Sequence, residues 1–393
     1  MSYENTSLYN DLPEVLQGME KNIKPNLYDT TLRDGEQTAG VSFSKEEKIE
    51  IALMLDELGV KRIEAGLPVI SKGDRDAVEA IASKGLKAEI WGFSRCVLND
   101  IDVNAEVGVS SIICEIATSE AKMKAYNYTE ESVYEKAMSS LLHAKEKKLK
   151  TAFFAVDATK TRPGFLKKMY QDAVKLGGAQ EVVLPDTMGG ASPEAIYYLV
   201  RQLKQWVDVP VHIHCHNDLA LATACNLAGI RAGADWLHVA LNGLGERSGN
   251  SDLAEIAVAA KMLYDVDFGI DLTKLTEVAD QVEQICGIKL SVMKPVTGRN
   301  IFTRDSGLVV TQLKRYPPSV ELYPPEMVGQ GRAVLINKKS GTHSIEYVME
   351  ELGCKITPET AVRMAEMVKK KAESRRGNIS NAELLEMYNE CKK

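Results

Sequence analysis

Short β-rich apolar runs alternate with longer amphipathic runs over most of this 393-residue chain. The candidate strands are residues 26–30, 62–66, 88–93, 110–117, 151–156, 181–185, 210–215 and 236–241. The helical stretches between them include residues 44–58, 74–83, 130–147, 163–176, 192–206 and 218–232. This alternation indicates parallel strands joined by crossover helices, and eight such units in about 240 residues favour a closed (β/α)₈ TIM barrel. The alternative is an open doubly wound sheet, but no dinucleotide glycine fingerprint follows the first strand.

Several of the predicted helices carry start signals. Ser44 and Glu47 have the spacing of a capping box, and Thr129 with Ser132 stands ahead of another amphipathic run. Ser192-Pro193 combines an N-cap residue with proline at the first helical position. These signals place helix starts directly before three of the predicted crossover helices.

The amino-acid composition of the chain changes near residue 290. The segments KPVTGRNIFTRDSG and RYPPSVELYPPE are rich in proline, glycine and charge, as ordered loops and linkers are. Three amphipathic helices are predicted after them, at residues 344–352, 358–374 and 380–391. We therefore predict three parts: an N-terminal extension (1–24), a TIM-barrel catalytic domain (25–290), and a linker with a C-terminal helical subdomain (291–393).

Composition excludes several classes of protein. Hydrophobic residues make up 45% and charged residues 26%, which suits a globular chain with a large core. The net charge of −7 argues against nucleic acid or an anionic membrane as a partner. We find no apolar run long enough for a transmembrane helix and no signal-peptide pattern at the N-terminus. Seven cysteines without a CxxC pair suggest neither a disulfide framework nor a cysteine zinc site, so we expect a cytoplasmic protein.

Reactive residues cluster at the predicted ends of the first, seventh and eighth strands, the face where barrel active sites lie. Arg33 and Asp34 follow the first strand. His214 and His216, the last two of three alternating histidines, point to the same side and can converge on one ion; two ordinary hydrogen-bonded histidines are the alternative. Imidazole and carboxylate together suit a divalent metal. In the loop after the eighth strand, Asn250 could add an oxygen ligand, and the glycines allow close backbone approach to a ligand or phosphate.

Three segments, LYDTTLRDGEQ, HCHNDLALATACNLAGIRAGA and NGLGERSGN, resemble the family of 2-isopropylmalate, homocitrate and citramalate synthases. The resemblance covers roughly residues 25–260 and includes IEAGLPVIS, WGFSRC, IATSE and LPDTMGGASPEA. It implies a TIM-barrel acyltransferase of amino-acid biosynthesis, a homodimer, with acetyl-CoA as co-substrate. It implies a divalent metal, Mg²⁺ or Mn²⁺ with Zn²⁺ as an alternative. The residues implied to hold or surround the metal are Asp34, His214, His216 and Asn250, with Arg33 stabilising negative charge and Glu36 and Gln37 supporting the site.

The chain departs from that family pattern on its fourth and fifth strands. Val156 stands where relatives have a catalytic glutamate, and Lys160 where they have an arginine. Glu115 on the fourth strand is the candidate replacement for the lost carboxylate; an ion pair with a nearby Lys or Arg is the alternative. Lys122 replaces a histidine of many relatives and is a candidate partner for a distal substrate carboxylate, the alternative being a solvated lysine.

Departures continue past the barrel, where Phe302–Val309 lacks both histidines of the corresponding family segment. Arg304 could hold an anion there, and Tyr323 is a candidate acid or hydrogen-bond donor. The chain also ends without room for the larger leucine-binding regulatory domain of typical isopropylmalate synthases, which favours homocitrate-synthase-like or Re-type citrate-synthase-like members. The residues expected to bind substrate are Arg95, Thr187, Lys122 and Arg304.

The resemblance therefore implies condensation of acetyl-CoA with a 2-oxo acid, held by the metal, to a 2-hydroxy di- or tricarboxylate and free CoA. The spare cations favour a dicarboxylate such as 2-oxoglutarate or oxaloacetate as the oxo acid. A metal-dependent lyase or aldolase of the HMG-CoA lyase type, running C–C cleavage, is the alternative, motivated by the missing proton-transfer residues. A metal-binding barrel without catalysis is a third hypothesis, against which the intact Arg33 argues.

Overall fold

The structure is a computed structural model that describes residues 6–21, 23–373 and 377–392. Residues 1–5 and 22 of the predicted N-terminal extension, and residue 374 of a predicted helix, lie outside the described residues. Backbone contacts divide the chain into two compact units, one spanning Leu8–Lys289 and the other containing Leu290–Lys393. None of the described helices is both long and apolar enough to cross a bilayer.

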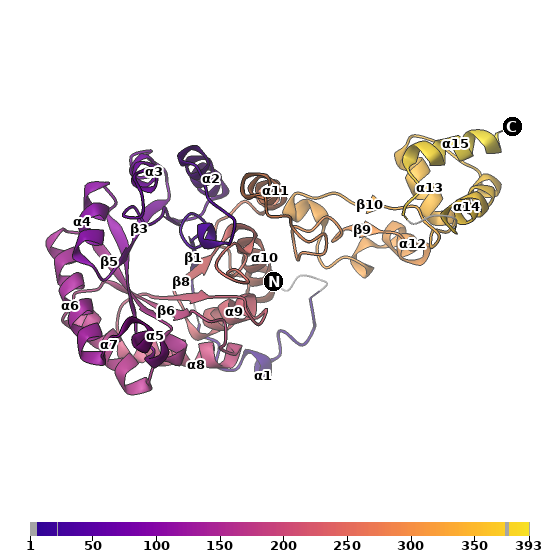
Figure 1. The fold of residues 1–393 in the computed structure, drawn as a ribbon. Coiled ribbons are helices and arrows are strands. Elements are labelled where there is room, and N and C mark those ends of the chain that lie inside the picture. Colours follow the sequence, from indigo (N-terminus) through magenta and orange to yellow (C-terminus); the bar gives the residue numbers. More distant parts are fainter. Residues whose placement is uncertain (1–5, 22, 374–376, 393) are drawn as a thin grey trace. The chain divides into compact units, whose positions relative to one another are not determined.

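The first unit is a closed barrel of eight parallel strands in sequence order, with β1 pairing with both β2 and β8 (Figure 1). The strands are β1 (Asn26–Asp29), β2 (Arg62–Glu64), β3 (Glu89–Arg95), β4 (Ser111–Ala117), β5 (Lys150–Val156), β6 (Glu181–Asp186), β7 (Val211–Cys215) and β8 (Trp236–Val239). Each begins and ends within two residues of its predicted run, so the predicted TIM barrel is confirmed.

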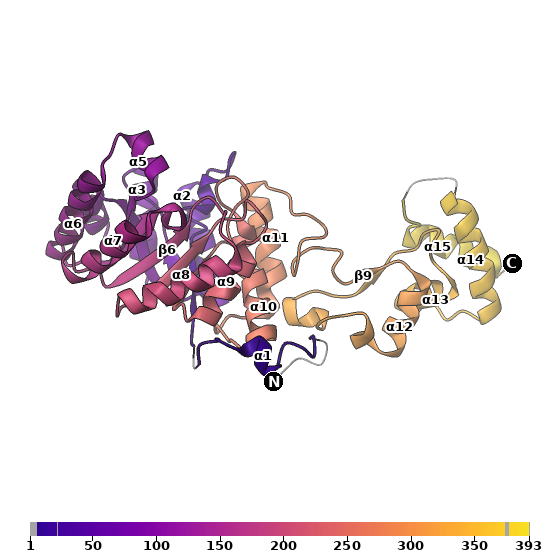
Figure 2. The ribbon, with the colours of Figure 1, turned by 90° about the horizontal axis from the view of Figure 1, so that it is seen from below.

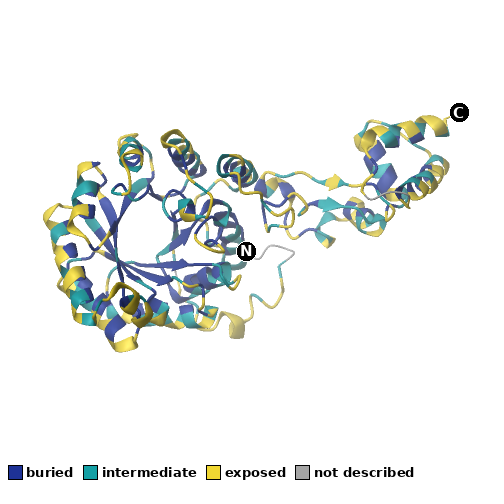
Figure 3. Cartoon of the chain, viewed as in Figure 1, coloured by how far each residue is buried: buried dark blue, intermediate teal, exposed yellow. Residues whose placement is uncertain are grey.

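Crossover helices surround the barrel. They are α2 (Lys45–Leu58), α3 (Lys72–Ala82), α4 (Leu98–Glu106), α6 (Glu130–Glu146), α7 (Pro163–Lys175), α8 (Pro193–Trp206), α9 (Ala222–Ala232) and α10 (Leu253–Tyr264). Short α1 (Pro13–Leu16) precedes β1, α5 (Glu120–Tyr126) lies in the loop after β4, and α11 (Leu275–Cys286) follows α10. In Figure 2, α8 and α9 run side by side outside the strands. Figure 3 shows the strands buried and the outer faces of the helices exposed, as expected for amphipathic crossover helices.

The predicted helix starts are confirmed at three positions. Ser44 and Glu47 form a reciprocal capping box, Thr129 and Ser132 form another, and Ser192 accepts a hydrogen bond from the backbone N–H of Ala195. Each of these side chains satisfies a backbone donor that the first helical turn would otherwise leave without a partner.

Several helices differ from the sequence-based ranges or have no counterpart among them, and α9 and α4 show two physical reasons. α9 begins at Ala222 and not at residue 218, because Ala220 has a positive φ of 58° and Asn217 Oδ1 accepts from the Ala222 N–H. α4 has no assignment in the sequence-based ranges, since Asn and Asp within it are weak helix formers. Tertiary contacts support it: Asn104 Nδ2 donates to the Phe93 carbonyl of β3 at 2.9 Å.

The interior of the barrel is filled at the N-terminal end of the strands. Arg62 lies between two aromatic rings, with its guanidinium carbon 4.8 Å from the Trp91 centroid and 3.6 Å from the Trp236 centroid. Above it, Tyr28, Phe93 and other buried side chains form one cluster. Because side chains close this end, the C-terminal ends of the strands are left to form the functional site.

The second unit is mostly helical and has its own core. A two-stranded parallel sheet of β9 (Thr303–Arg304) and β10 (Ala333–Val334) accompanies α12 (Gly307–Arg315), α13 (Thr342–Glu351), α14 (Pro358–Glu373) and α15 (Asn381–Cys391). Ile345, Met364 and Leu384, one from each of the last three helices, are fully buried in a shared cluster. The predicted C-terminal helical region is therefore confirmed.

Candidate metal centre and active site

Three side chains converge at the C-terminal end of the barrel. Asp34 follows β1, and His214 and His216 stand at the end of β7. His214 Nε2 lies 3.3 Å and His216 Nε2 lies 3.6 Å from Asp34 Oδ2, and the two Nε2 atoms are 3.3 Å apart. All three side chains are buried, and their ligand atoms lie within 4.8 Å of one another. Asp34, His214 and His216 thus form a buried metal-binding triad.

The chemistry of this donor set fits a cation, because three lone-pair donors that face one another are stabilised by positive charge between them. Burial, with the charge of His214 added, lowers the pKa of His216 to about 4. Burial alone would raise the pKa of Asp34, but Arg33 and the two histidines outweigh it and hold that pKa well below its usual value. An ionised carboxylate and a neutral imidazole are the protonation states that metal ligation requires.

Asn250 lies against the triad. Its backbone forms an antiparallel bridge with His216, and its Nδ2 donates to Asp34 Oδ2 and to the Leu244 carbonyl, both at 2.9 Å. Its Oδ1 is buried and has no hydrogen-bond partner in the described part of the chain. Asn250 therefore orients the Asp34 carboxylate and retains one oxygen for the predicted contact with a metal.

The glycines of the loop after β8 allow the loop to fold tightly upon itself. Gly249 has a φ of 84°, and a Cβ there would lie 1.9 Å from the Gly243 carbonyl oxygen. A Cβ on Gly245 would lie 2.3 Å from Asn250 Nδ2. The sequence predicts that these glycines let the backbone approach a ligand. In the structure they let parts of this loop approach one another, and this packing positions Asn250.

One arginine connects three loops at the rim of the site. Arg247 Nε donates to Asp218 Oδ1 at 2.8 Å and its Nη2 donates to the Thr187 carbonyl at 2.6 Å. The hydroxyl of Thr187 accepts from the Asp157 backbone N–H at 2.8 Å. Thr187, predicted to bind substrate, thus lies where the loops after β5, β6, β7 and β8 are held together.

Arg33 is almost fully buried beside the triad. Its Nε donates to Glu64 Oε2 at 2.7 Å, its Nη1 lies 3.8 Å from Asp34 Oδ1, and its guanidinium carbon lies 4.1 Å from the Phe93 ring centroid. Its Nη2 is buried without a hydrogen-bond partner among the described residues. Burial opposes the charge, but Glu64 and Asp34 outweigh burial and raise the pKa of Arg33 further. The site therefore holds a permanent cation with one unused donor.

Glu36 and Gln37 do not join the triad directly. Glu36 Oε2 lies 2.6 Å from Lys48 Nζ, and Glu36 Oε1 accepts from the Phe43 N–H at 2.9 Å. Gln37 is exposed and lines a cavity of about 300 Å³ together with Arg33 and Glu36. The carboxylate of Glu36 thus secures the loop that carries Arg33, which agrees with the supporting role expected for it.

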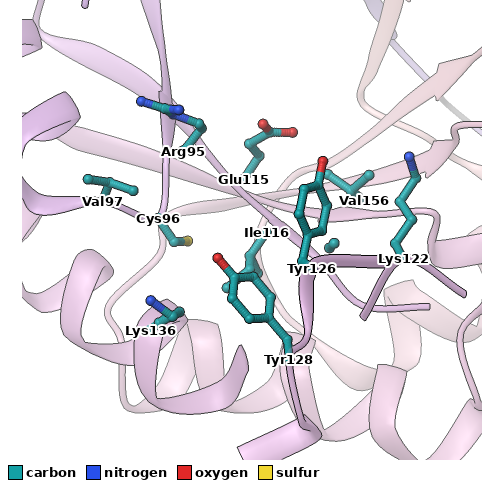
Figure 4. Close-up of a pocket in the computed structure, with 11 residues that line it drawn as sticks. Arg95, Cys96, Val97, Glu115, Ile116, Lys122, Tyr126, Tyr128, Lys136 and Val156 are labelled. Carbon is teal, nitrogen blue, oxygen red and sulfur yellow. The ribbon is translucent and has the colours of Figure 1, made fainter. Parts of the chain in front are cut away.

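A second cavity, of about 270 Å³, opens beside Glu115 and is shown in Figure 4. Tyr126, Tyr128, Lys122 and Val156 are among its lining residues. In the figure, the Lys122 amine and the Tyr126 hydroxyl point the same way as the Glu115 carboxylate. Burial raises the pKa of Glu115 to about 7, although Arg33 opposes the rise. This carboxyl group can therefore exchange a proton near neutral pH.

Two predicted substrate-binding arginines contact other groups of the protein, although Arg95 also lines the cavity beside Glu115. Arg95 forms a two-point ion pair with Asp100, at 2.7 and 3.1 Å, and its guanidinium points away from Glu115 in Figure 4. Arg304 of the second unit donates to the carbonyls of Ile301, Thr303 and Val320. These contacts give both side chains a structural role, which the sequence pattern did not indicate. Tyr323, also in the second unit, is buried with its ring edge-on to Phe302.

Some site residues were missed by the sequence interpretation. Glu64, which holds Arg33, is the clearest; an acidic residue in the middle of the buried strand RIEAG is the signal that could have found it. Phe93, Tyr126 and Tyr128 gave no signal, because aromatic residues are as common in cores as in sites. His212 lies on β7 with the two ligating histidines, but it hydrogen-bonds to Glu181 inside the barrel and takes no part in the triad.

Family models match both units of the chain. The model described as HMGL-like matches residues 24–282, and the one described as homocitrate synthase post-HMGL domain-like matches residues 296–376. The first match contains the barrel with the whole metal-binding triad.

Relatives of similar length or longer carry synthase names. Homocitrate synthase AksA of Methanothermobacter thermautotrophicus is 40% identical over 359 residues, which is 91% of each chain. The 2-isopropylmalate synthase of Methanocaldococcus jannaschii is 40% identical over 354 residues, 89% of this chain and 68% of that one. Among solved structures, an HMG-CoA lyase of Bacillus subtilis superposes with a TM-score of 0.61 at 21% identity, over 69% of this chain and 96% of that one. At that identity the likeness concerns the fold alone.

Proposed function

The chain belongs to the HMGL-like family and is an acyltransferase of the 2-isopropylmalate and homocitrate synthase group, and we propose that the 2-oxo acid that it condenses with acetyl-CoA carries a second carboxylate. With 2-oxoglutarate or oxaloacetate, the acetyl methyl carbon loses a proton and bonds to the keto carbon, while the C=O π bond breaks and the former keto oxygen takes up a proton to become a hydroxyl. Water then cleaves the thioester to give a 2-hydroxy tricarboxylate and CoA. The observation that carries the proposal is the buried triad of Asp34, His214 and His216 with the Arg33 guanidinium beside it.

Asp34, His214 and His216 would hold a divalent ion, which would supply Lewis-acid chemistry at the keto acid, and their mixed oxygen and nitrogen ligands suit Mg²⁺ or Mn²⁺, with Zn²⁺ as the alternative. Asn250 Oδ1 is the further oxygen that we assign to this ion, because it is buried next to the triad and has no other partner among the described residues.

Negative charge that develops on the former keto oxygen needs a fixed donor. Arg33 is suited to this, since Glu64 and Phe93 hold its guanidinium in place while its Nη2 remains without a hydrogen-bond partner in the described chain. A preorganised donor in a water-poor site stabilises such charge strongly. Glu36 acts here as a positioning residue for the Arg33 loop, and the supporting role of Gln37 stays a prediction.

We assign the general base to Glu115. A base works best when its pKa lies near the working pH, and burial raises the pKa of Glu115 to about 7. Glu115 also faces the cavity, where an acetyl methyl group can reach it, and Arg33 lies close enough to influence its charge. This carboxylate would take over from the one that Val156 replaces. The acid role of Tyr323 stays a prediction.

The cavity beside Glu115 suits the distal end of the oxo acid. Lys122 supplies a cation that forms no ion pair with the described residues, and the Tyr126 and Tyr128 side chains line the same space. Thr187 lies at the rim of the site. Arg95 lines this cavity too but is paired with Asp100, and Arg304 donates to backbone carbonyls, so Lys122 is the main candidate for the second carboxylate. A homodimer in the cytoplasm completes the proposal, by analogy with the family.

The test is a panel of 2-oxo acids with acetyl-CoA and a thiol-detecting dye, run with Mg²⁺, Mn²⁺ or Zn²⁺. We expect metal-dependent release of CoA with 2-oxoglutarate or oxaloacetate, faster than with pyruvate or 2-oxoisovalerate. The control is a surface variant, Glu146→Gln, which should match the wild type. Release of thiol with monocarboxylic oxo acids alone would refute the substrate assignment, and no release with any acid or metal would refute the condensation.

A further inference from the structure

Below the metal-binding triad, the barrel interior contains a glutamate and two histidines to which the proposed chemistry gives no role. Glu181 lies on β6, His212 on β7 and His238 on β8, and each is less than a twentieth exposed. His212 Nε2 lies 2.5 Å from Glu181 Oε2, and His212 Nδ1 lies 3.1 Å from His238 Nε2. The three side chains thus form a continuous hydrogen-bonded row inside the barrel.

The proton positions in this row follow from its first member. Glu181 accepts from Arg62 Nη1 at 2.6 Å and Nη2 at 3.0 Å, and Lys150 Nζ lies 2.8 Å from its Oε1. Burial alone would raise the pKa of Glu181, but His212, Arg62 and Lys150 outweigh it and hold that pKa well below its usual value. An ionised carboxylate only accepts hydrogen bonds, so the proton between Glu181 and His212 must sit on His212 Nε2.

The proton in the hydrogen bond between His212 and His238 can be placed in the same way. Arg62 and Lys150 already balance the charges of Glu181 and Glu89, so a second proton on either buried ring would add an unpaired charge, and each ring is neutral with one proton. Since that of His212 is on Nε2, its Nδ1 is an acceptor, and His238 must donate from Nε2. His238 Nδ1 is then left with a lone pair, and it is buried with no hydrogen-bond partner among the described residues.

The neighbouring metal ligand His214 has a ring N–H that needs an acceptor. The register that pairs His212 with Trp236 on β8 places His214 beside His238, and their ring centroids are 5.3 Å apart with the planes at 82°. His214 Nε2 points at Asp34 and His216, so as a ligand it carries no proton, and its Nδ1 must carry one. His214 Nδ1 is also buried and has no partner in the described chain.

We propose that, with metal bound, His238 Nδ1 accepts the Nδ1–H of His214, so that Glu181, His212 and His238 fix the tautomer of a metal ligand. Partners of this kind orient ligating histidines and make them better donors. His238 is thus a positioning residue. The inference rests on the triad as a metal site and is independent of which oxo acid is condensed.

Two contacts favour His238 over the other acceptor nearby. Tyr28 stacks on the His238 ring, with centroids 4.2 Å apart and planes 10° apart, which holds the ring beside His214. Glu64 is the competing acceptor, since the charge of His214 influences its pKa. Its two oxygens already accept from Tyr28 Oη at 3.2 Å and Arg33 Nε at 2.7 Å.

The first test measures Zn²⁺ affinity by competition with a chelating fluorophore. His238→Phe keeps a ring against Tyr28 but removes the acceptor, and we expect Zn²⁺ to bind about 10- to 100-fold more weakly. His238→Gln supplies an amide oxygen and should recover much of the loss. His143→Gln, a change on the outer helix α6, is the control and should bind as the wild type does. Wild-type affinity in His238→Phe would overturn the proposal.

The second test needs no variant of His238 and is independent of how well such variants fold. Long-range ¹⁵N–¹H spectra report which nitrogen of each of the six histidines carries a proton. With Zn²⁺ bound, we expect two rings, those of His214 and His216, with a proton on Nδ1 and metal on Nε2, and His238 protonated on Nε2. In His212→Phe, His238 should show both tautomers. A wild-type His238 protonated on Nδ1 would overturn the proposal, whatever the outcome of the oxo-acid panel.

Discussion

Glu64 holds Arg33 in place from inside the barrel: Glu64 Oε2 accepts from Arg33 Nε at 2.7 Å, and both side chains are almost fully buried. Phe93 covers the other side of the guanidinium, with its ring centroid 4.1 Å from the guanidinium carbon. The arginine next to a metal ligand is therefore held by a strand that carries no part of the triad. Removing either member of this pair should have effects on stability and on turnover that can be separated.

Glu64→Ala leaves the buried Arg33 charge without its closest partner. Loss of one partner of a buried ion pair costs about 3–5 kcal/mol. We expect the free energy of unfolding, measured with urea, to fall by that order. The matched control is Glu106→Ala, which removes an exposed ion pair with Arg75 of similar length, 2.8 Å. Exposed pairs contribute about 0–1 kcal/mol. Equal losses in both variants would contradict the role given to Glu64.

Arg33→Ala should separate metal binding from catalysis. Because Arg33 is not a metal ligand but supplies a fixed donor to developing charge, we expect turnover to fall by about 100- to 1,000-fold. Metal affinity, followed by calorimetric titration, should stay within a few-fold of wild type. Unchanged turnover in Arg33→Ala would contradict the catalytic role of Arg33.

Glu115→Gln removes the proposed base and should lower kcat by about 100- to 10,000-fold. Burial raises the pKa of Glu115 to about 7, so in the wild type kcat/KM should rise with pH through about 7, as the carboxylate form appears. A pH–rate profile measures this acid limb, and the residual activity of Glu115→Gln should lack it. The same limb in the variant would assign the base to another group.

The stability of the protein should also depend on the ionisation of Glu115. Because the pKa of Glu115 is raised in the folded state, the folded protein binds this proton more tightly than the unfolded chain does. The free energy of unfolding therefore falls as the pH rises from about 4.5 to about 7. Glu115→Gln has no such proton to lose. Its Tm relative to wild type should therefore be higher at pH 8 than at pH 5, in thermal unfolding of the metal-free proteins.

Gly249→Ala should damage the metal site through the backbone. The φ of 84° is unfavourable for alanine, and a Cβ would lie 1.9 Å from the Gly243 carbonyl oxygen, so the loop must move. We expect a loss of about 1–3 kcal/mol in stability and weaker metal binding, because Asn250 is displaced. Gly164→Ala is the control, since a Cβ there meets nothing within 4 Å. Metal affinity equal in both variants would show that the loop does not place Asn250.

Lys122→Met should change selectivity more than turnover. If Lys122 binds the second carboxylate, KM for the dicarboxylic oxo acid should rise by about tenfold or more, which corresponds to about 1.4 kcal/mol. KM for a monocarboxylic oxo acid such as pyruvate should hardly change. Steady-state kinetics with both substrates check this. An equal rise for both acids would place Lys122 outside the distal subsite.

Features that depend on neighbouring residues could be predicted from the sequence. Strand and helix ranges follow from hydrophobic period and capping residues such as Ser44, and both act over a few neighbouring residues. His214 and His216 could be paired because residues two apart in a strand share a face. The helix α4 could not be found this way, since its Asn104 is supported by the carbonyl of Phe93, a contact made only in the folded chain.

The amino-acid sequence by itself determined the barrel, the family and the residue types of the triad, because these depend on short-range patterns and motifs. Only the tertiary structure decided which charged side chains are available. Arg95 lines the same cavity as Lys122 but is paired with Asp100, and Arg304 donates to backbone carbonyls, whereas Lys122 forms no ion pair with the described residues. Partners distant in sequence, such as Glu64 for Arg33 and His238 beside His214, meet only in the folded barrel, because the pairing of β1 with β2 and of β7 with β8 brings them together and buries their polar groups.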